Sequence, residues 1–156
     1  MDSSALITLA GGGALSLLAL APGPVCTVQE VYEETVEAGL ARGFPDAVEI
    51  SHYFRDQRVS IRSPRRDERV EGVSRADSRV LLLAEELGAA DLLVNDRTLL
   101  GKAVERGLPA RFTLEFVVDL SDAGRLSRKR RDALIENFVA RGRYSREFVA
   151  AVLLGR

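Results

Sequence analysis

Short apolar runs alternate with helix-type patterns through residue 107, and this alternation constrains the fold more than any other feature of the sequence. Apolar runs bounded by turn residues predict strands at VCTV (25–28), RVSIR (58–62) and DLLVN (91–95). The helical spacing of apolar residues predicts helices over 3–10, 13–21, 29–40, 45–54, 74–87 and 97–107. Strands that alternate with helices indicate an α/β fold with a parallel sheet flanked by helices.

Beyond residue 107 the sequence shows only helical patterns, over 112–122, 128–141 and 145–154. The chain has 156 residues, of which 46% are hydrophobic and 29% charged, and this composition is typical of a globular protein with a real core. We therefore expect one domain over residues 1–156 that ends in a helical tail at about 112–156.

The composition also restricts the chemistry of any site. Cys26 is the only cysteine and His52 the only histidine, which excludes an internal disulfide framework and a histidine-rich zinc site. The net charge of −1 gives no overall field that would attract nucleic acid or a membrane. The chemistry open to this chain is mainly that of carboxylates.

The apolar start of the chain, MDSSALITLAGGGALSLLALA, does not have the pattern of a targeting segment. It carries Asp2 where a signal peptide has positive charge, and Gly11–Gly13 interrupt the apolar run before the roughly 20 residues that span a bilayer. We expect it to form the core of a soluble domain in a reducing cytoplasm, without a membrane segment.

Acidic residues stand where the predicted strands give way to helices. In an open parallel sheet ligands bind beyond the carboxyl ends of the strands, and Asp96 directly follows the strand at 91–95. An aspartate at a helix start is also a common N-cap, so each acid taken alone has a structural reading. Carboxylates gathered in one cleft repel each other unless a hard cation such as Mg²⁺ or Mn²⁺ binds them. The candidates for such a cluster are Asp2, Glu33, Glu34, Asp77 and Asp96.

Several segments resemble PIN-domain ribonucleases. The opening DSSALITLA resembles the start of that family, TVQEVYEETVEAG is similar to the segment with its second acid, and SRADSRVLLLAEELGAADLLVNDRTLLGKAVERGL resembles its central block. The last part, LSDAGRLSRKRRDALIENFVARGRYSREFVAAVL, resembles the helical tail of a prokaryotic subgroup, VapC-like toxins or a related one. The resemblance covers nearly the whole chain and implies a PIN-like three-layer fold.

The resemblance also implies an activity, namely cleavage of single-stranded RNA by metal-activated water. Four acids around one or two Mg²⁺ or Mn²⁺ ions would correspond to Asp2, Glu34, Asp77 and Asp96, with Glu33 left open as an alternative to Glu34. Ser4 and Asn95 would orient these acids by hydrogen bonds. A role as the toxin of a toxin–antitoxin pair, an antitoxin as partner and a homodimer follow from the same resemblance.

One departure from the family pattern favours an alternative. Only Met1 precedes Asp2, where family members have several apolar residues of a central first strand. The alternative is a PIN-like module that has lost catalysis and binds RNA or a protein. A phosphotransferase with Asp2 as nucleophile is disfavoured because Ser4 stands where such enzymes have a second aspartate, and a nucleotide-binding loop because no P-loop lysine follows the glycines.

Two basic segments are candidates for an RNA path. Acids interleave the first segment, so we expect a solvated surface that neutralises itself there, whereas the second is denser but begins a helix. The first segment contains Arg55, Arg58, Arg62, Arg65, Arg66 and Arg69, and the second contains Arg125, Arg128, Lys129, Arg130 and Arg131.

Overall fold

The strands pair in parallel, as the sequence predicts, but they form two separate pairs rather than one sheet. The computed structural model describes residues 1–155. Strand β1 (Cys26–Thr27) pairs with β2 (Ser60–Ile61), and β3 (Leu92–Val94) pairs with β4 (Ala110–Phe112). Each pair forms its own two-stranded sheet. The expected α/β class with parallel pairing is confirmed.

Strand β4 corrects the expectation of helix alone beyond residue 107. Ala110 and Arg111 are partly buried and Phe112 is buried, so the strand has no alternation of buried and exposed residues that would mark it. What makes them a strand is pairing with β3, which is fully buried, and this pairing begins with the hydrogen bond that the Leu92 N–H donates to the Pro109 carbonyl at 2.8 Å. A contact between segments this far apart in the chain leaves no signal in the local pattern.

The first two residues lie between the two sheets. The Met1 ammonium donates to the Cys26 carbonyl of β1 at 3.2 Å, and the Asp2 N–H donates to the Leu93 carbonyl of β3 at 3.2 Å. The Thr27 hydroxyl donates to the Met1 carbonyl at 2.7 Å. Met1 and Asp2 therefore occupy the position of a central strand that links the two sheets.

The helices lie where apolar periodicity predicts them, with two local departures. The segment predicted as a helix at 13–21 forms a 3-10 helix, η1 (Leu15–Leu20), and the helix predicted at 29–40 contains a π-helical turn, η2 (Glu33–Glu37), between α2 (Gln29–Tyr32) and α3 (Ala38–Ala41). The others are α1 (Ser3–Gly11), α4 (Pro45–Arg55), α5 (Arg75–Leu87), α6 (Arg97–Glu105), α7 (Thr113–Asp122), α8 (Arg128–Ala140) and α9 (Arg146–Leu154). The last residue of the expected tail, Arg156, lies outside the described residues.

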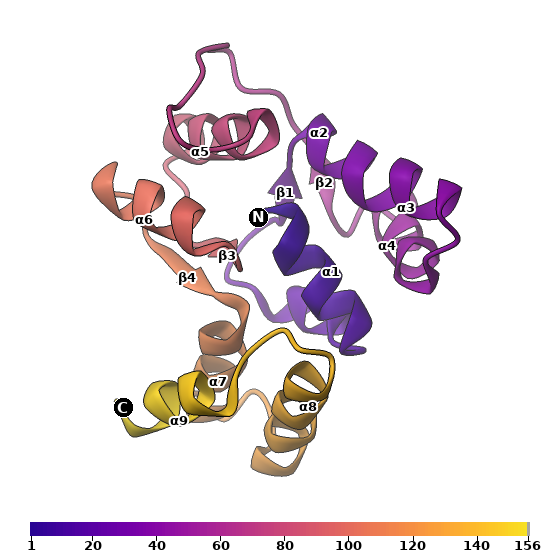
Figure 1. Ribbon diagram of the computed structural model, residues 1–156, viewed down its shortest axis with the longest axis vertical. Helices are drawn as coiled ribbons and strands as arrows, with labels where there is room; N and C mark the ends of the chain where they lie inside the picture. Colours follow the sequence, from indigo (N-terminus) through magenta and orange to yellow (C-terminus); the bar gives the residue numbers. More distant parts are fainter. Residues whose placement is uncertain (156) are drawn as a thin grey trace.

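Helix α1 is the centre of the molecule. It contacts α4, β3 and α7, and it lies between the α2–α4 segment and the β3–α6 segment (Figure 1). Its side chains Ala5, Leu6 and Leu9 are fully buried and belong to one continuous apolar cluster that reaches from β1 to α9. Among the described residues no helix is long and apolar enough to cross a membrane.

Candidate functional site

Asp96 caps the start of a helix, which is the structural role that its sequence position predicts. It is the N-cap of α6, and its Oδ1 accepts a hydrogen bond from the Leu99 N–H at 2.8 Å. The residue is nevertheless exposed and lies two positions beyond the end of β3. The cap engages one carboxylate oxygen and fixes the side chain, so a ligand still has access to the carboxylate.

Asp77 faces the same hollow as Asp96. Ser74 caps α5: its Oγ accepts from the Asp77 N–H at 3.0 Å and donates to Asp77 Oδ2 at 2.8 Å. The hollow has a volume of about 660 Å³ and is lined by the loop residues 69–73 together with Ser74, Asp77, Asp96 and Thr98. We call this space the Asp77–Asp96 hollow. The two helix starts thus bring together acids that are nineteen positions apart in the sequence.

Asp2 does not line this hollow and is buried, with 2% of its surface exposed. Its Oδ1 accepts from the Ala5 N–H at 2.7 Å, and its Oδ2 accepts from the Ser4 hydroxyl at 2.6 Å and the Asn95 N–H at 3.3 Å. Burial raises the pKa of Asp2, and these hydrogen bonds offset part of that shift. Burial also lowers the pKa of the Met1 amino group. A carboxylate that is desolvated in this way gains from a nearby cation.

Glu34 contacts Ser3, the residue that follows Asp2 in the chain. The Ser3 hydroxyl donates to Glu34 Oε2, so the π-helical turn η2 contacts the start of α1. The Thr35 hydroxyl donates to the Val31 carbonyl at 2.7 Å, a local bond that competes with the regular helical pattern and accompanies the wider turn. Glu33 and Glu34 both line a smaller hollow of about 330 Å³, in which Ser74 also takes part.

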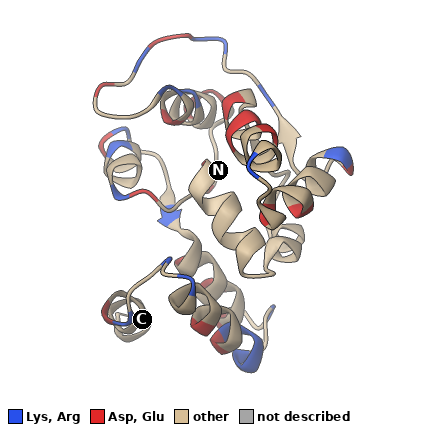
Figure 2. Ribbon diagram, turned by 45° about the vertical axis from the view of Figure 1, so that its right-hand side comes forward, with Lys and Arg blue, Asp and Glu red and all other residues tan. Residues whose placement is uncertain are grey.

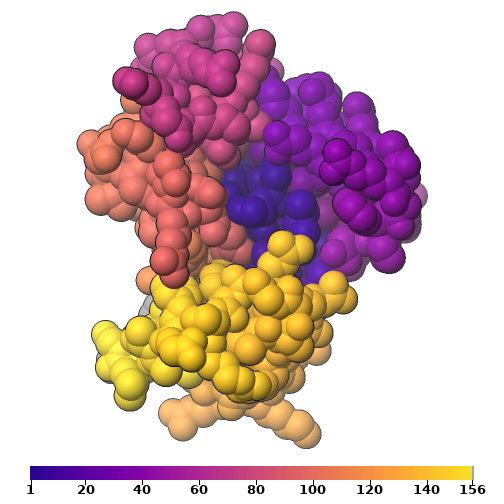
Figure 3. Space-filling model, in the orientation of Figure 1, coloured from indigo at the N-terminus to yellow at the C-terminus, as the bar shows by residue number. Residues whose placement is uncertain are grey.

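The four predicted acids do not form one tight cluster. Asp77 and Asp96 share the larger hollow, and Glu34 lines a second one in which Ser74 also takes part. Asp2 accepts a hydrogen bond from the backbone N–H of Asn95, and its chain neighbour Ser3 donates one to Glu34. Within residues 1–155 no group of three or more acidic, histidine or cysteine side chains is close enough to hold a metal ion. Figure 3 shows the N-terminal residues in a depression between the α2–α4 segment, α5, α6 and the C-terminal helices.

Asn95 fixes the junction between Asp2 and Asp96. Its Nδ2 donates to Thr8 Oγ1 at 2.6 Å, and its Oδ1 accepts from the Thr113 N–H at 3.1 Å and from the Tyr144 hydroxyl. The side-chain amide thus uses its acceptor twice and is locked in one orientation. Sequence reasoning named Asn95 as an orienting residue but missed Tyr144, since nothing in the tail sequence places that residue beside β3.

The basic segments have different surroundings. In the loop before α5, Arg66 forms ion pairs with Glu68, Glu85 and Glu86, which agrees with the expected self-neutralised surface, but the side chains of Arg65 and Arg69 form none among the described residues. Figure 2 shows acids on the α2–η2 segment near the N-terminus and basic residues in this loop and on α8. Helix α8 lies at the opposite end of the molecule from α5 (Figure 1), so its basic residues do not border the Asp77–Asp96 hollow.

Comparison with known proteins gives one match. A family model described as a PIN domain matches residues 1–156. No curated protein and no solved structure matches the chain significantly.

Proposed function

Since the chain belongs to the PIN domain family, whose members are in general nucleases, we propose that it is a metal-dependent endoribonuclease that hydrolyses single-stranded RNA. The match over 1–156 confirms the expected family and its α/β fold. The RNA substrate, the use of Mg²⁺ or Mn²⁺ and the four acids as the site are parts of the proposal.

One observation supports the proposal most strongly. Two carboxylates from separate helix starts, Asp77 and Asp96, line one hollow, and the backbone N–H of Asn95, the residue before Asp96, donates to the buried carboxylate of Asp2. Helix capping by itself does not require Asp77 and Asp96 to share a hollow. It also does not require Asp2 to be buried, which raises the pKa of that carboxyl.

The donor set fits a hydrated hard cation. All the candidate side chains offer oxygen, and Mg²⁺ in proteins is commonly held by one or two carboxylates while it keeps several waters. Asp77 and Asp96 would hold the ion in the hollow, and Asp2 and Glu34 would act from its border. When bound, a divalent ion supplies a water of lowered pKa and neutralises charge on the phosphate.

The residues of the chain prepare this chemistry by positioning. Ser74 restrains the Asp77 carboxylate, and the Leu99 N–H restrains that of Asp96. Ser4 and the Asn95 N–H favour the ionised form of Asp2 because they donate hydrogen bonds to its carboxylate. Each acid is thus held before a substrate arrives, which lowers the reorganisation needed during reaction.

The substitution Asp96→Asn tests the proposal. Asparagine is as good an N-cap as aspartate, so the fold should be retained, while the loss of a charged oxygen ligand should lower kcat/KM by roughly 100-fold or more. The measurement is cleavage of a labelled single-stranded RNA with Mn²⁺ or Mg²⁺. Asp132→Asn on α8 is the matched control and should keep full activity, since the one ion pair of Asp132 in the described part of the chain is with the adjacent Arg131. Unchanged cleavage by the Asp96→Asn variant would contradict the proposal.

A second candidate, a PIN-like module that binds RNA or a protein without cleaving it, is favoured by a specific observation. No three acids are close enough to hold a metal within the described residues, and both oxygens of Asp2 already accept hydrogen bonds. Calorimetric titration with Mn²⁺ separates the two candidates: the nuclease takes up the ion with an affinity that Asp77→Asn weakens, and the module binds RNA without taking up metal.

The proposal includes a biological setting. We place the enzyme in the cytoplasm as the toxin of a toxin–antitoxin pair and as a homodimer, as the sequence resemblance implies. Exposed apolar side chains on the α3–α4 segment, Leu40, Phe44 and Val48, support a protein partner. Light scattering of the purified chain, alone and with a co-expressed antitoxin, measures both associations.

A further inference from the structure

Among residues 1–155, Arg69 is the only basic residue that lines the Asp77–Asp96 hollow. The charged residues that share the hollow with it are Glu71, Asp77 and Asp96. Its guanidinium forms no ion pair and no side-chain hydrogen bond among the described residues, whereas Arg66 and Arg106 nearby are both paired with Glu85. The Arg69 guanidinium, with its five N–H donors, is therefore unpaired at a hollow whose other charged residues are acidic.

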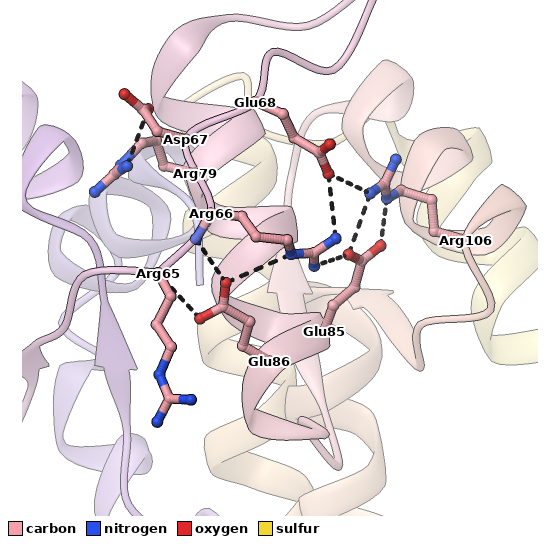
Figure 4. Close-up of polar contacts among 8 residues, drawn as sticks. All are labelled: Arg65, Arg66, Asp67, Glu68, Arg79, Glu85, Glu86 and Arg106. Carbon is pink, nitrogen blue, oxygen red and sulfur yellow. Dashed lines mark hydrogen bonds and ion pairs between the residues drawn. The ribbon is translucent and has the colours of Figure 1, made fainter.

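The loop that carries Arg69 is anchored on its N-terminal side by carboxylates of α5 (Figure 4). Glu86 accepts from the backbone N–H groups of Arg65 at 2.8 Å and Arg66 at 3.0 Å. The Arg66 guanidinium contacts Glu85, which also binds Arg106 of the α6 C-terminus. These bonds tie the loop to the ends of two helices and fix its course before residue 69.

A second anchor follows immediately after Arg69. The Val70 N–H donates to the Ser78 hydroxyl of α5 at 3.1 Å, and the Val70 side chain is 8% exposed. Before Arg69, Glu68 pairs with Arg66 at 3.2 Å. Since both chain neighbours are held, the backbone of Arg69 is fixed and its long side chain remains free to contact a ligand.

We infer that Arg69 is the phosphate-binding residue of this site and contacts a backbone phosphate of bound RNA. The inference rests on the proposed function, because it takes its ligand from the same hollow. A planar guanidinium matches the geometry of phosphate oxygens, and an arginine already paired with a carboxylate is not available for that contact. Arg65, four residues earlier in the same loop, has an equally unpaired side chain that points away from the cluster in Figure 4 and does not line the hollow.

This difference between two arginines of one loop gives a matched test. RNA binding is measured by fluorescence anisotropy with a labelled single strand in Mg²⁺, on the Asp96→Asn background so that the RNA stays intact. Adding Arg69→Gln should weaken binding about tenfold and reduce the slope of log Kd against log salt by about 0.7. Adding Arg65→Gln should change neither, and Arg69→Lys should keep the slope because it keeps the charge.

The outcomes separate this inference from the proposed function. If RNA binds and Arg69→Gln has no larger effect than Arg65→Gln, the inference is wrong while the nuclease proposal stands. If binding depends on Arg69 but the unsubstituted protein cleaves no RNA with either metal, the phosphate contact stands and the nuclease proposal is wrong. If no variant binds RNA, both are overturned. Thermal unfolding of each variant by circular dichroism verifies that the fold is retained.

Discussion

At the scale of single residues, Tyr144 connects the C-terminal helices to the candidate site. Its hydroxyl donates to Asn95 Oδ1 and accepts from the Leu114 N–H at 3.2 Å. The ring packs between Phe138 and Phe148. Burial raises the pKa of Tyr144 to about 12. Tyr144 thus donates to the side-chain amide of Asn95, and the backbone N–H of the same residue donates to Asp2.

The Tyr144→Phe variant should be less stable at neutral pH by about 1–3 kcal/mol, because the Leu114 N–H loses its buried acceptor. Urea unfolding followed by circular dichroism measures this loss. Tyr53→Phe is the control, since no hydrogen bond to its hydroxyl is part of the described structure, and its stability should change little. An equal loss in both variants would contradict the role given to the Tyr144 hydroxyl.

The same hydroxyl predicts an alkaline pH dependence. The pKa of Tyr144 is raised from 10.0 to about 12, so the unfolded state loses this proton first as the pH rises. The contribution of the neutral phenol is therefore complete below about pH 10 and is lost as the pH rises toward 12, by up to about 1.4 kcal/mol per pH unit. The measurement is the free energy of unfolding from pH 9 upward, in which Tyr144→Phe should show a shallower decline than the unsubstituted protein.

At the scale of elements, the carboxylate of Glu86 is one of the contacts that hold the loop between β2 and α5. Glu86 binds two consecutive backbone N–H groups, and these hydrogen bonds lower the pKa of its carboxyl. No helix or strand lies between Ile61 and Arg75, so such contacts replace regular structure along this stretch. The loop forms one wall of the Asp77–Asp96 hollow.

We expect Glu86→Ala to make the loop between β2 and α5 more mobile without unfolding the protein. The amides of Arg65 and Arg66 lose their acceptor, so hydrogen exchange over 62–73 should become faster while that of α5 stays slow. Mass spectrometry of peptides from the loop measures the rates, and Glu49→Ala on exposed α4 is the control. Unchanged exchange in the loop would show that Glu86 does not hold it.

At the scale of the whole molecule, helix α8 packs against the end of α1. Phe138 of α8 is fully buried and lies against Gly12, the C-cap of α1, so closely that a Cβ on Gly12 would overlap the ring. Gly12 has φ −83°, a conformation open to any residue, so the glycine is needed for space and not for its backbone.

Gly12→Ala should therefore destabilise the protein by about 1–3 kcal/mol through overpacking against Phe138. Gly101, in the interior of α6 with no atom near its Cβ direction, is the matched contrast: Gly101→Ala should stabilise by about 0.5–1 kcal/mol through helix propensity. Thermal unfolding measures both shifts. A Gly12→Ala variant as stable as the parent would mean that α8 can move away from α1.

Local physics made most of the helices predictable from the sequence. Ser74, Gly88 and the spacing of Val80, Leu81 and Ala84 fix α5 almost to the residue, because capping and apolar periodicity act within one or two helical turns. The family resemblance was readable for the same reason, since it rests on such local blocks. The side-chain role of Asp96 as an N-cap also follows from its neighbours alone.

The sequence by itself thus determined the helices, the parallel α/β class and the acids that stand at strand ends and helix starts. Only the tertiary structure decided that β4 is a strand, that Met1 and Asp2 bridge two sheets, and that Asp77 and Asp96 share a hollow while Glu34 lines another. It also decided that Arg66 is paired with acids of its surroundings. The physical reason is range: capping and periodicity act between residues a few positions apart, whereas strand pairing, burial of Asp2 and charge pairing depend on segments that meet only when the chain has folded.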